Sequence, residues 1–341
     1  MEKILTISIA AYNVEKYIEK ALKSLIIKNI NKLEILVQDD GSKDNTSIIA
    51  KKYEKLYPNS IKVIKKENGG YGSTINNSIK IATGKYFKQL DGDDWYNINN
   101  LELLIDKLEK IDVDIVYTPY SKYFEKNKEL KLIDRFFEIK EGEYKLEEII
   151  KKIYSKKNKS FMMPSLIFKT KILQKNDIKC QEKCFYTDTE FVIYPLIYAK
   201  TIYISKLSLY YYRIGREGQS ISLENRKKYF NDHLKVSTLL LNAISNIENK
   251  KTQKYFYLLE CICGHIAYTI TNFLLVLPIS KKNLDKIKRL DLEIKINNFM
   301  VYKKIEKISK TIFLLRKSLY LLYPILHLRM INKIKKELNY E

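Results

Sequence analysis

The chain has 341 residues, of which 45% are hydrophobic and 30% charged, and its formal net charge is +22 at neutral pH. This length and composition exclude a disordered chain and fit one large domain, alone or with an extension. The charge indicates anionic partners, although a lysine-rich soluble protein without such partners has a similar composition.

Short apolar runs alternate with segments of helical periodicity in the first 118 residues. Strands are predicted at 4–10, 33–37, 61–64, 86–90 and 115–118, and helices at 14–27, 44–57, 73–82 and 101–108. This alternation predicts an α/β fold, in which helices flank a mainly parallel sheet.

The rest of the chain changes character twice. The polar stretches 125–131 and 140–159 indicate surface loop and helix, whereas 165–168 and 201–204 indicate strands. From residue 224 onward the pattern is helical throughout. We therefore predict a domain of residues 1–222 and a helical C-terminal region of residues 223–341.

The basic excess is concentrated in the C-terminal region. Residues 225–341 hold 23 Lys and Arg against 9 Asp and Glu. The apolar stretch 312–331 also contains Arg316, Lys317 and Arg329. A basic amphipathic helix that lies in an anionic membrane surface, with Tyr320 and Tyr323 as interfacial aromatics, fits this pattern. Packing on the protein core and true membrane spanning are the alternatives.

The N-terminus lacks the pattern of a secretory signal. Residues 1–11 are apolar, but the run is short and is better explained as a buried first strand. We therefore expect a cytoplasmic protein, peripheral at the inner face of the plasma membrane.

Carboxylates follow two of the predicted strands. Asp39 and Asp40 come after the second strand, and Asp91, Asp93 and Asp94 come after the fourth. Ligands of open parallel sheets bind beyond the carboxyl ends of the strands. Crowded carboxylates need a compensating cation, and Mn²⁺ or Mg²⁺ takes both carboxylate and phosphate oxygens. The pattern predicts a metal-bridged diphosphate, although a solvated turn or a helix cap explains either cluster alone.

Five motifs occur along the chain in a fixed order. They are ISIAAYN, VQDDGSKDNT, NGGYGSTINNSIKIATGKYFKQLDGDDW, FYTDTEF and YYRIGREGQSIS. In this order they resemble the family 2 glycosyltransferases, closely over 3–120 and more loosely over 160–222. The resemblance implies the Rossmann-like GT-A fold and an inverting enzyme of bacterial polysaccharide or envelope glycan synthesis. It also implies a nucleotide diphosphate sugar donor, with UDP-sugar as the first expectation, and a glycan or lipid-linked acceptor.

The resemblance assigns a role to individual positions. Donor binding falls on Ala10, Tyr12, Asn13, Asp39, Asp40, Asn68, Gly70, Asn76, Asp91, Gly92, Arg213, Arg216, Gln219 and Ser220. Ala10, Tyr12 and Asp40 are expected to line the base pocket, with Asp39 close by. Asp91 and Asp93 match the aspartate-x-aspartate motif, in which Asp93 holds the metal and Asp91 lies near the donor ribose and sugar.

The catalytic base implied by the resemblance is Asp188, with Glu190 as the second candidate. A carboxylate there accepts the proton of the acceptor hydroxyl. A helix cap is the alternative for Asp188, and ordinary surface arginines are the alternative for Arg213 and Arg216. Some relatives use a histidine as a further metal ligand. That ligand is not expected here, because every histidine of the chain lies in the C-terminal region.

Three other functions compete with this interpretation. A nucleotidyltransferase usually carries a glycine-rich basic loop after its first strand, where this chain has AAYNVEKY. A catalytically inactive nucleotide-binding scaffold would not need the set of Asp91, Asp93 and Asp188. A nucleic-acid binder is suggested by charge alone, and we expect no nucleic-acid partner because no recognised binding motif accompanies the basic excess. The sequence does not predict an oligomeric state.

Overall fold

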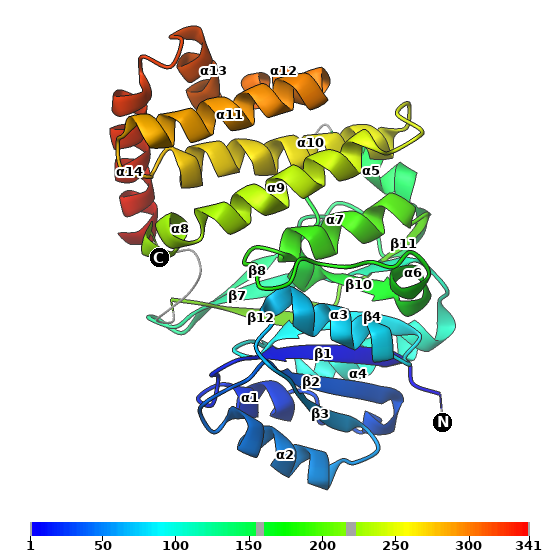
Figure 1. The fold of residues 1–341 in the computed structure, drawn as a ribbon. Helices are drawn as coiled ribbons and strands as arrows, with labels where there is room; N and C mark the ends of the chain where they lie inside the picture. Colours follow the sequence, from blue (N-terminus) through cyan, green and yellow to red (C-terminus); the bar gives the residue numbers. More distant parts are fainter. Residues whose placement is uncertain (1, 155–159, 216–222, 340–341) are drawn as a thin grey trace. The chain divides into compact units, whose positions relative to one another are not determined.

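The structure is a computed structural model that describes residues 2–154, 160–215 and 223–339. The chain forms two compact units, Met1–Gly215 and Arg216–Glu341 (Figure 1). The boundary that we predict between residues 222 and 223 falls at the edge of a segment outside the described residues.

An eight-stranded sheet in the order β3-β2-β1-β4-β10-β6-β11-β9 forms the core of the first unit. The strands are β1 (Leu5–Ala11), β2 (Leu33–Asp39), β3 (Ile61–Lys65), β4 (Tyr86–Asp91), β6 (Ile115–Tyr117), β9 (Gly142–Lys145), β10 (Leu166–Lys169) and β11 (Thr201–Ile204). The first four strands are parallel, and β10 runs antiparallel between β4 and β6. β1 and β2 are buried along almost their whole length, which explains their continuous apolar sequences.

Helices connect these strands. They are α1 (Ile18–Lys23), α2 (Thr46–Leu56), α3 (Tyr71–Ile81), α4 (Ile98–Lys110), α5 (Leu146–Tyr154), α6 (Thr170–Lys175) and α7 (Asp188–Tyr198), with short 3₁₀ turns at Ile30–Lys32 and Met163–Ser165. α1 is shorter than predicted because the segment before it is bonded to the turn before α2. The amide of Val14 donates to Thr46 Oγ1 (2.9 Å), and that of Glu15 donates to Asp44 Oδ2 (3.0 Å). The predicted strand–helix alternation is otherwise confirmed.

A second, four-stranded sheet was not predicted. Its order is β5-β12-β7-β8, with β5 (Trp95–Tyr96), β7 (Tyr120–Phe124), β8 (Glu129–Ile133) and β12 (Tyr210–Ile214). The expectation of loop or helix at 125–131 is wrong for the residues of β8, and that at 140–159 is wrong for β9. β8 alternates polar and apolar residues over only five positions between lysine-rich stretches, and its leucines stay exposed, so its pattern does not stand out from a surface loop.

The second unit is entirely helical in its described part. It contains α8 (Leu223–Lys228), α9 (Phe230–Ser245), α10 (Gln253–Thr269), a π-helical turn (Ile270–Leu274), α11 (Lys281–Asn297), α12 (Phe299–Ile308), α13 (Lys310–Lys317) and α14 (Tyr323–Asn339). α10 packs against α9 and α12, and its residues Leu258, Ile262 and Ile266 are buried. Among the helices of the described residues, none combines the length and the apolar character needed to cross a bilayer.

The interfacial helix predicted at 312–331 is wrong in its geometry. The segment consists of the end of α13, a turn and the start of α14. Leu319 and Tyr320 adopt left-handed backbone angles (φ 50° and 68°), which interrupt the helix. The expected interfacial tyrosines face the protein instead: the Tyr320 hydroxyl donates to Asp291 Oδ2 (2.6 Å), and Tyr323 is buried.

Candidate active site

The central strand β1 ends between two acidic turns. Ala11 is paired with Asp39 of β2 on one side, and Ala10 is paired with Asp91 of β4 on the other. The Gly92 amide donates to the Ala10 carbonyl (2.9 Å), and a Cβ at Gly92 would lie only 2.8 Å from that oxygen. Glycine therefore allows the second turn to lie against β1. The carboxylates that follow the two predicted strands flank one strand end.

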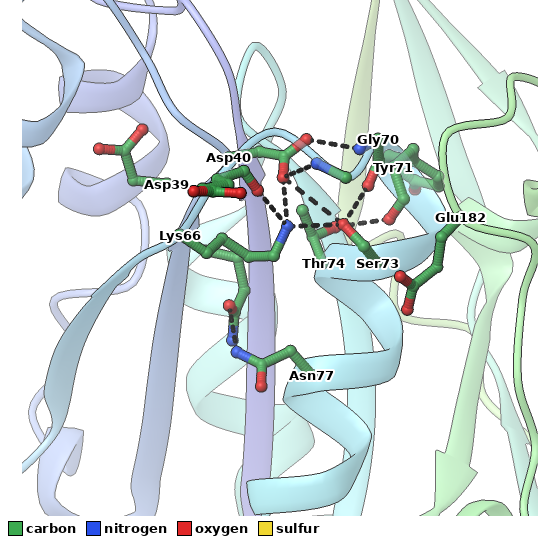
Figure 2. Close-up of polar contacts among 12 residues, drawn as sticks. Asp39, Asp40, Lys66, Gly70, Tyr71, Ser73, Thr74, Asn77 and Glu182 are labelled. Atoms are coloured by element: carbon green, nitrogen blue, oxygen red, sulfur yellow. Dashed lines mark hydrogen bonds and ion pairs between the residues drawn. The ribbon is translucent and has the colours of Figure 1, made fainter.

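In the first turn, Asp40 acts as an anchor within the protein. Its carboxylate accepts the amides of Gly69 (2.9 Å) and Gly70 (2.8 Å) and forms an ion pair with Lys66. The Lys66 ammonium also donates to Ser73 Oγ (2.7 Å), so the turn before α3 closes around Asp40 (Figure 2). The sequence places Asp40 at the nucleotide base, but in the structure its acceptor capacity is used by this turn.

The neighbouring Asp39 has unused acceptor capacity. Its side chain is fully buried, and Oδ1 accepts the Ser42 amide (2.9 Å). Oδ2 is buried without a hydrogen-bond partner among the described residues. Burial of an unpaired carboxylate oxygen is costly, so this atom indicates a missing donor from a ligand or water.

Other residues of the first two motifs shape this region. Asn13 connects β1 to the first turn: its amide donates to Ser42 Oγ (3.1 Å), and its Oδ1 accepts the Lys43 amide (2.9 Å). Tyr12 and Asn68 are exposed near this turn. Tyr12 therefore presents an accessible ring at the end of β1.

The second turn brings Asp91, Asp93 and Asp94 together, with one oxygen of each within 4.8 Å of the others. Asp94 is buried, and its oxygens accept the Tyr210 hydroxyl (2.6 Å) and the Arg213 amide (2.7 Å). Burial and the charges of Asp93 and Asp91 raise the pKa of Asp94 well above its usual range. A divalent cation relieves such repulsion, so this set of hard oxygen donors fits Mn²⁺ or Mg²⁺. Asp91 and Asp93 are only partly buried, which makes them the better candidate ligands.

The side chain of Arg213 supports the second turn. Its Nε donates to the Asp93 carbonyl (2.7 Å), and its guanidinium pairs with Glu125. The same group lies over the rings of Tyr17 and Trp95, at 4.7 and 4.9 Å from their centroids. The phosphate contact implied for Arg213 is therefore replaced here by contacts within the protein. Arg216, Gln219 and Ser220 lie outside the described residues.

The two candidate bases lie in the first turn of α7 but in different environments. Glu190 is fully buried, and its oxygens accept the Gln181 amide (2.8 Å) and the Tyr194 hydroxyl (3.2 Å). Asp188 keeps an accessible surface, although the protein atoms crowded around its carboxyl raise its pKa by desolvation. The geometry therefore favours Asp188 over Glu190 as a group that can meet a substrate.

Two tyrosines connect Asp188 electrostatically to the second turn. The Tyr71 hydroxyl donates to Asp91 Oδ1 (2.7 Å), and its pKa is raised by burial and then by the charges of Asp91 and Asp188. The pKa of Tyr212 is also raised by burial and by Asp91, Asp94 and Asp188. Because such effects weaken with distance, Asp188 and Asp91 belong to one site. Sequence reasoning missed both tyrosines, although they lie inside the NGGYG and YYRIG motifs.

Asn76 holds the segment that leads to α7. Its amide nitrogen donates to the Cys180 carbonyl (2.9 Å) and to Glu182 (3.0 Å), and its oxygen accepts the Cys180 amide (2.8 Å). A Cβ at Gly72 would lie 2.0 Å from the Gln181 carbonyl, so this segment packs directly on α3. Asn76 therefore contributes to the position of α7, whereas the resemblance places it at the donor.

The histidines belong to the helical unit. His233 is buried, its Nδ1 lies 2.7 Å from Thr269 Oγ1, and its ring stacks on His265 with 4.3 Å between centroids. His327 Nδ1 lies 2.7 Å from the Leu275 carbonyl. Each histidine therefore has partners within its own unit.

Comparison with known proteins identifies the family. The model of the family described as "Glycosyl transferase family 2" matches residues 6–176. The chain belongs to glycosyltransferase family 2. The predicted resemblance is thereby confirmed, and this family-2 protein is a glycosyltransferase.

Two relatives found by sequence similarity support this family assignment. The family-2 chain is 28% identical over 249 residues to "Putative glycosyltransferase EpsH" of Bacillus subtilis (strain 168), across 72% of this chain and 70% of that protein. It is 30% identical over 249 residues to "Minor teichoic acid biosynthesis protein GgaB" of the same organism, across 70% of this chain but only 26% of that protein. The chain therefore spans about a quarter of GgaB.

Solved structures show the same fold. The structure of S. aureus TarS 1–349 in complex with UDP-GlcNAc matches with a TM-score of 0.68 at 20% identity, across 99% of this chain and 92% of that one. The mannosyltransferase PcManGT from Pyrobaculum calidifontis, in complex with GDP-Man and Mn²⁺, matches with a TM-score of 0.52 at 14% identity, across 99% and 88%. These likenesses confirm the expected GT-A fold with a C-terminal helical region.

Proposed function

We propose that this glycosyltransferase moves a sugar from a nucleoside diphosphate sugar, with UDP-sugar as the first candidate, to a hydroxyl of a glycan or lipid-linked acceptor. The reaction is metal-dependent and inverting and serves the synthesis of cell-envelope polysaccharide. The observation that carries the proposal is the grouping of Asp39 and the Asp91–Asp94 turn at the end of β1, with Asp188 near Tyr71, whose hydroxyl contacts Asp91. The name of GgaB, a teichoic acid biosynthesis protein, supports the envelope context, and the UDP-GlcNAc bound to TarS supports the class of donor.

The nucleotide base binds at the first turn. The buried Oδ2 of Asp39 accepts the ring N–H of uracil, which satisfies its missing hydrogen bond. The exposed ring of Tyr12 stacks on the base, next to the backbone of Ala10. Asp40 and Asn13 hold the surrounding turns, and Asn68 and Gly70 border the nucleotide.

The diphosphate binds at the second turn. Asp93 would hold Mn²⁺ or Mg²⁺ with help from Asp91, and the ion would supply positive charge to offset that of the leaving diphosphate. Gly92 keeps this turn against β1, while Arg213 braces the Asp93 carbonyl. In the last motif, Arg216, Gln219 and Ser220 are proposed to contact the phosphate oxygens.

Asp188 acts as the general base. Its carboxylate accepts the proton of the acceptor hydroxyl while that oxygen attacks the anomeric carbon and the bond to the diphosphate breaks. Attack on the face opposite the leaving group inverts the anomeric centre. Desolvation of Asp188 raises its pKa toward the working pH, which makes it a stronger base. Glu190 remains the second candidate and otherwise fixes the start of α7.

We assign catalysis to residues 1–222 and membrane association to the basic helical residues 223–341. The enzyme is proposed to act in the cytoplasm, peripheral at the anionic inner face of the plasma membrane. A basic surface near the membrane would concentrate the protein where a lipid-linked acceptor is found.

The first experiment measures release of nucleoside diphosphate from a panel of nucleotide sugars with Mn²⁺, Mg²⁺ or EDTA. We compare the wild type with Asp93→Asn and with Asp106→Asn, which changes an exposed acid of α4. Metal-dependent release from one donor, lost only in Asp93→Asn, is the expected result. If the wild type neither releases nor binds uridine diphosphate in calorimetry with metal, the protein is an inactive scaffold of the same fold.

A further inference from the structure

The turn between α13 and α14 has an unusual backbone. Leu319 and Tyr320 both adopt left-handed angles, with φ of 50° and 68°. Branched and aromatic residues rarely occupy this region, and two in succession persist only where surrounding contacts fix them. A strained turn made by large apolar residues suggests that their direction matters.

Contacts to the helical unit fix the turn. The Tyr320 amide donates to the Leu315 carbonyl (2.8 Å), and the Tyr320 hydroxyl donates to Asp291 Oδ2 (2.6 Å). Arg316 binds the same buried carboxylate through Nε, at 3.0 Å from each oxygen. Because Tyr320 is drawn inward, its neighbours Leu319 and Leu321 face outward, and 80% and 82% of their surfaces are exposed.

The exposed apolar surface continues along α14. Ile325 (63% exposed) and Leu328 (59%) lie three residues apart in α14, which places them on one helix face, and Leu321 lies in the turn just before this helix. The other face of α14 already packs on the unit through Tyr323, Leu326, Met330 and Ile334. The first face is therefore not needed for the unit's own core. We call Leu319, Leu321, Ile325 and Leu328 the apolar ridge.

The charge around the ridge has one sign. Residues 309–336 contain seven Lys and Arg and no Asp or Glu. Arg316 is used by Asp291, and the remaining six are exposed: Lys310, Lys317, Arg329, Lys333, Lys335 and Lys336. Large exposed apolar side chains in a segment whose charged residues are all cations match a surface that is apolar inside and anionic outside.

We propose that the apolar ridge enters the interfacial region of an anionic lipid bilayer, where the surrounding lysines and Arg329 bind the headgroups. Leu319 and Leu321 reach deepest because they are the most exposed. This inference rests on the proposed membrane location of the enzyme, and it replaces the single interfacial helix expected from the sequence by a fixed turn with its own set of residues. A lipid occupant is favoured over a second copy of the chain because the six exposed like charges would repel those of the other copy across a symmetric interface.

The experiment measures co-sedimentation of the full chain with phosphatidylcholine vesicles that contain or lack phosphatidylglycerol. The variant is L319S/L321S, and the matched control is L130S/L132S, which changes two exposed leucines of β8 (52% and 60% exposed). We expect the wild type and the control to bind only anionic vesicles, with partitioning weakened by salt. The partition coefficient of the ridge variant onto anionic vesicles should be at least about tenfold lower, because the variant lacks two leucine side chains that would leave water on binding.

Two further measurements separate this inference from the proposed function. Circular dichroism should show that the ridge variant folds, and its release of nucleoside diphosphate in solution should equal that of the wild type. A vesicle result obtained in this way stands even if no donor is hydrolysed. Equal binding of the ridge variant and the wild type to anionic vesicles would overturn the inference. The inference would also be overturned if the wild type did not bind vesicles and light scattering showed an oligomeric wild type but a monomeric ridge variant.

Discussion

The two acidic turns at the end of β1 handle their negative charge differently. In the first turn the chain supplies the counter-charge, because Lys66 forms an ion pair with Asp40. In the second turn, burial and the charges of Asp93 and Asp91 raise the pKa of Asp94, which is the sign of accumulated negative charge. A turn that is neutralised internally can bind an uncharged base, whereas a turn with excess negative charge can bind a cation.

In both turns, two adjacent acids have different roles. In each, the second acid of an adjacent pair is an anchor: Asp40 accepts the amides of the turn before α3, and Asp94 accepts Tyr210 and Arg213 of β12. The first acid of each pair, Asp39 or Asp93, acts on a ligand in the proposed function. The comparison therefore predicts different consequences for acids that stand next to each other in the sequence.

The largest effect is expected at the second turn. Asp93→Asn removes the proposed metal ligand and should lower kcat/KM about 10³-fold, because charge on the leaving diphosphate is no longer neutralised. The folded state should keep its stability, since the Asp93 carbonyl still accepts Arg213 Nε. Steady-state kinetics against Mn²⁺ concentration, together with urea unfolding, would check both statements. An Asp93→Asn enzyme with unchanged Mn²⁺ dependence contradicts the assignment.

The next largest effect on activity is expected at Asp188. A substitution there tests whether α7 belongs to the same site as the two turns. Asp188→Asn should lower kcat about 10²-fold or more. Because the base must be ionised, kcat should fall as the pH drops through the pKa of Asp188, which lies above that of an ordinary aspartate. The pH profile of kcat in the wild type should show this acidic limb, and the residual activity of Asp188→Asn should lack it. Glu190→Gln with an intact acidic limb would confirm the choice between the two acids.

Substitutions in the first turn should mainly lower the free energy of unfolding. Lys66→Met leaves the buried Asp40 carboxylate without its cation and should cost about 2–3 kcal/mol of unfolding free energy. Lys66 remains partly exposed, so the cost lies at the low end for buried pairs. Combining Lys66→Met with Asp40→Asn should recover part of the loss in a double-mutant cycle. Additive losses in urea unfolding would show that the two side chains do not depend on each other.

The sequence predicts much of this arrangement, and its failures have physical causes. β1, β2 and β4 are buried on both faces, so their apolar runs and the acids that follow them are visible in the sequence. The pairing of Asp40 with Lys66 is not visible in the sequence, because it depends on how β3 lies beside β2. An exposed strand such as β8 has only a short alternation of apolar residues, which is easily taken for a polar loop. The inward direction of Arg213 depends on the second sheet, which the sequence did not reveal.

The smallest effect is expected where the second sheet meets the second turn. The Tyr210 hydroxyl donates to Asp94 Oδ2 (2.6 Å) and accepts the Asp91 amide (3.2 Å). Tyr210→Phe should therefore cost about 1–2 kcal/mol of stability and raise the Mn²⁺ concentration for half-maximal activity about threefold, since the turn is less well held.

Tyr211→Phe is the matched control. Tyr211 lies next to Tyr210 on β12, and its hydroxyl accepts a hydrogen bond from Asn97 Nδ2 (2.8 Å). Within the described part of the chain, it forms no hydrogen bond with the acids of the turn. Its loss should lower stability to a similar extent and leave the Mn²⁺ dependence unchanged. If both variants shift the metal dependence equally, the effect comes from general loosening of β12. If only Tyr210→Phe does, the second turn is positioned by its buried anchor Asp94, as the first turn is by Asp40.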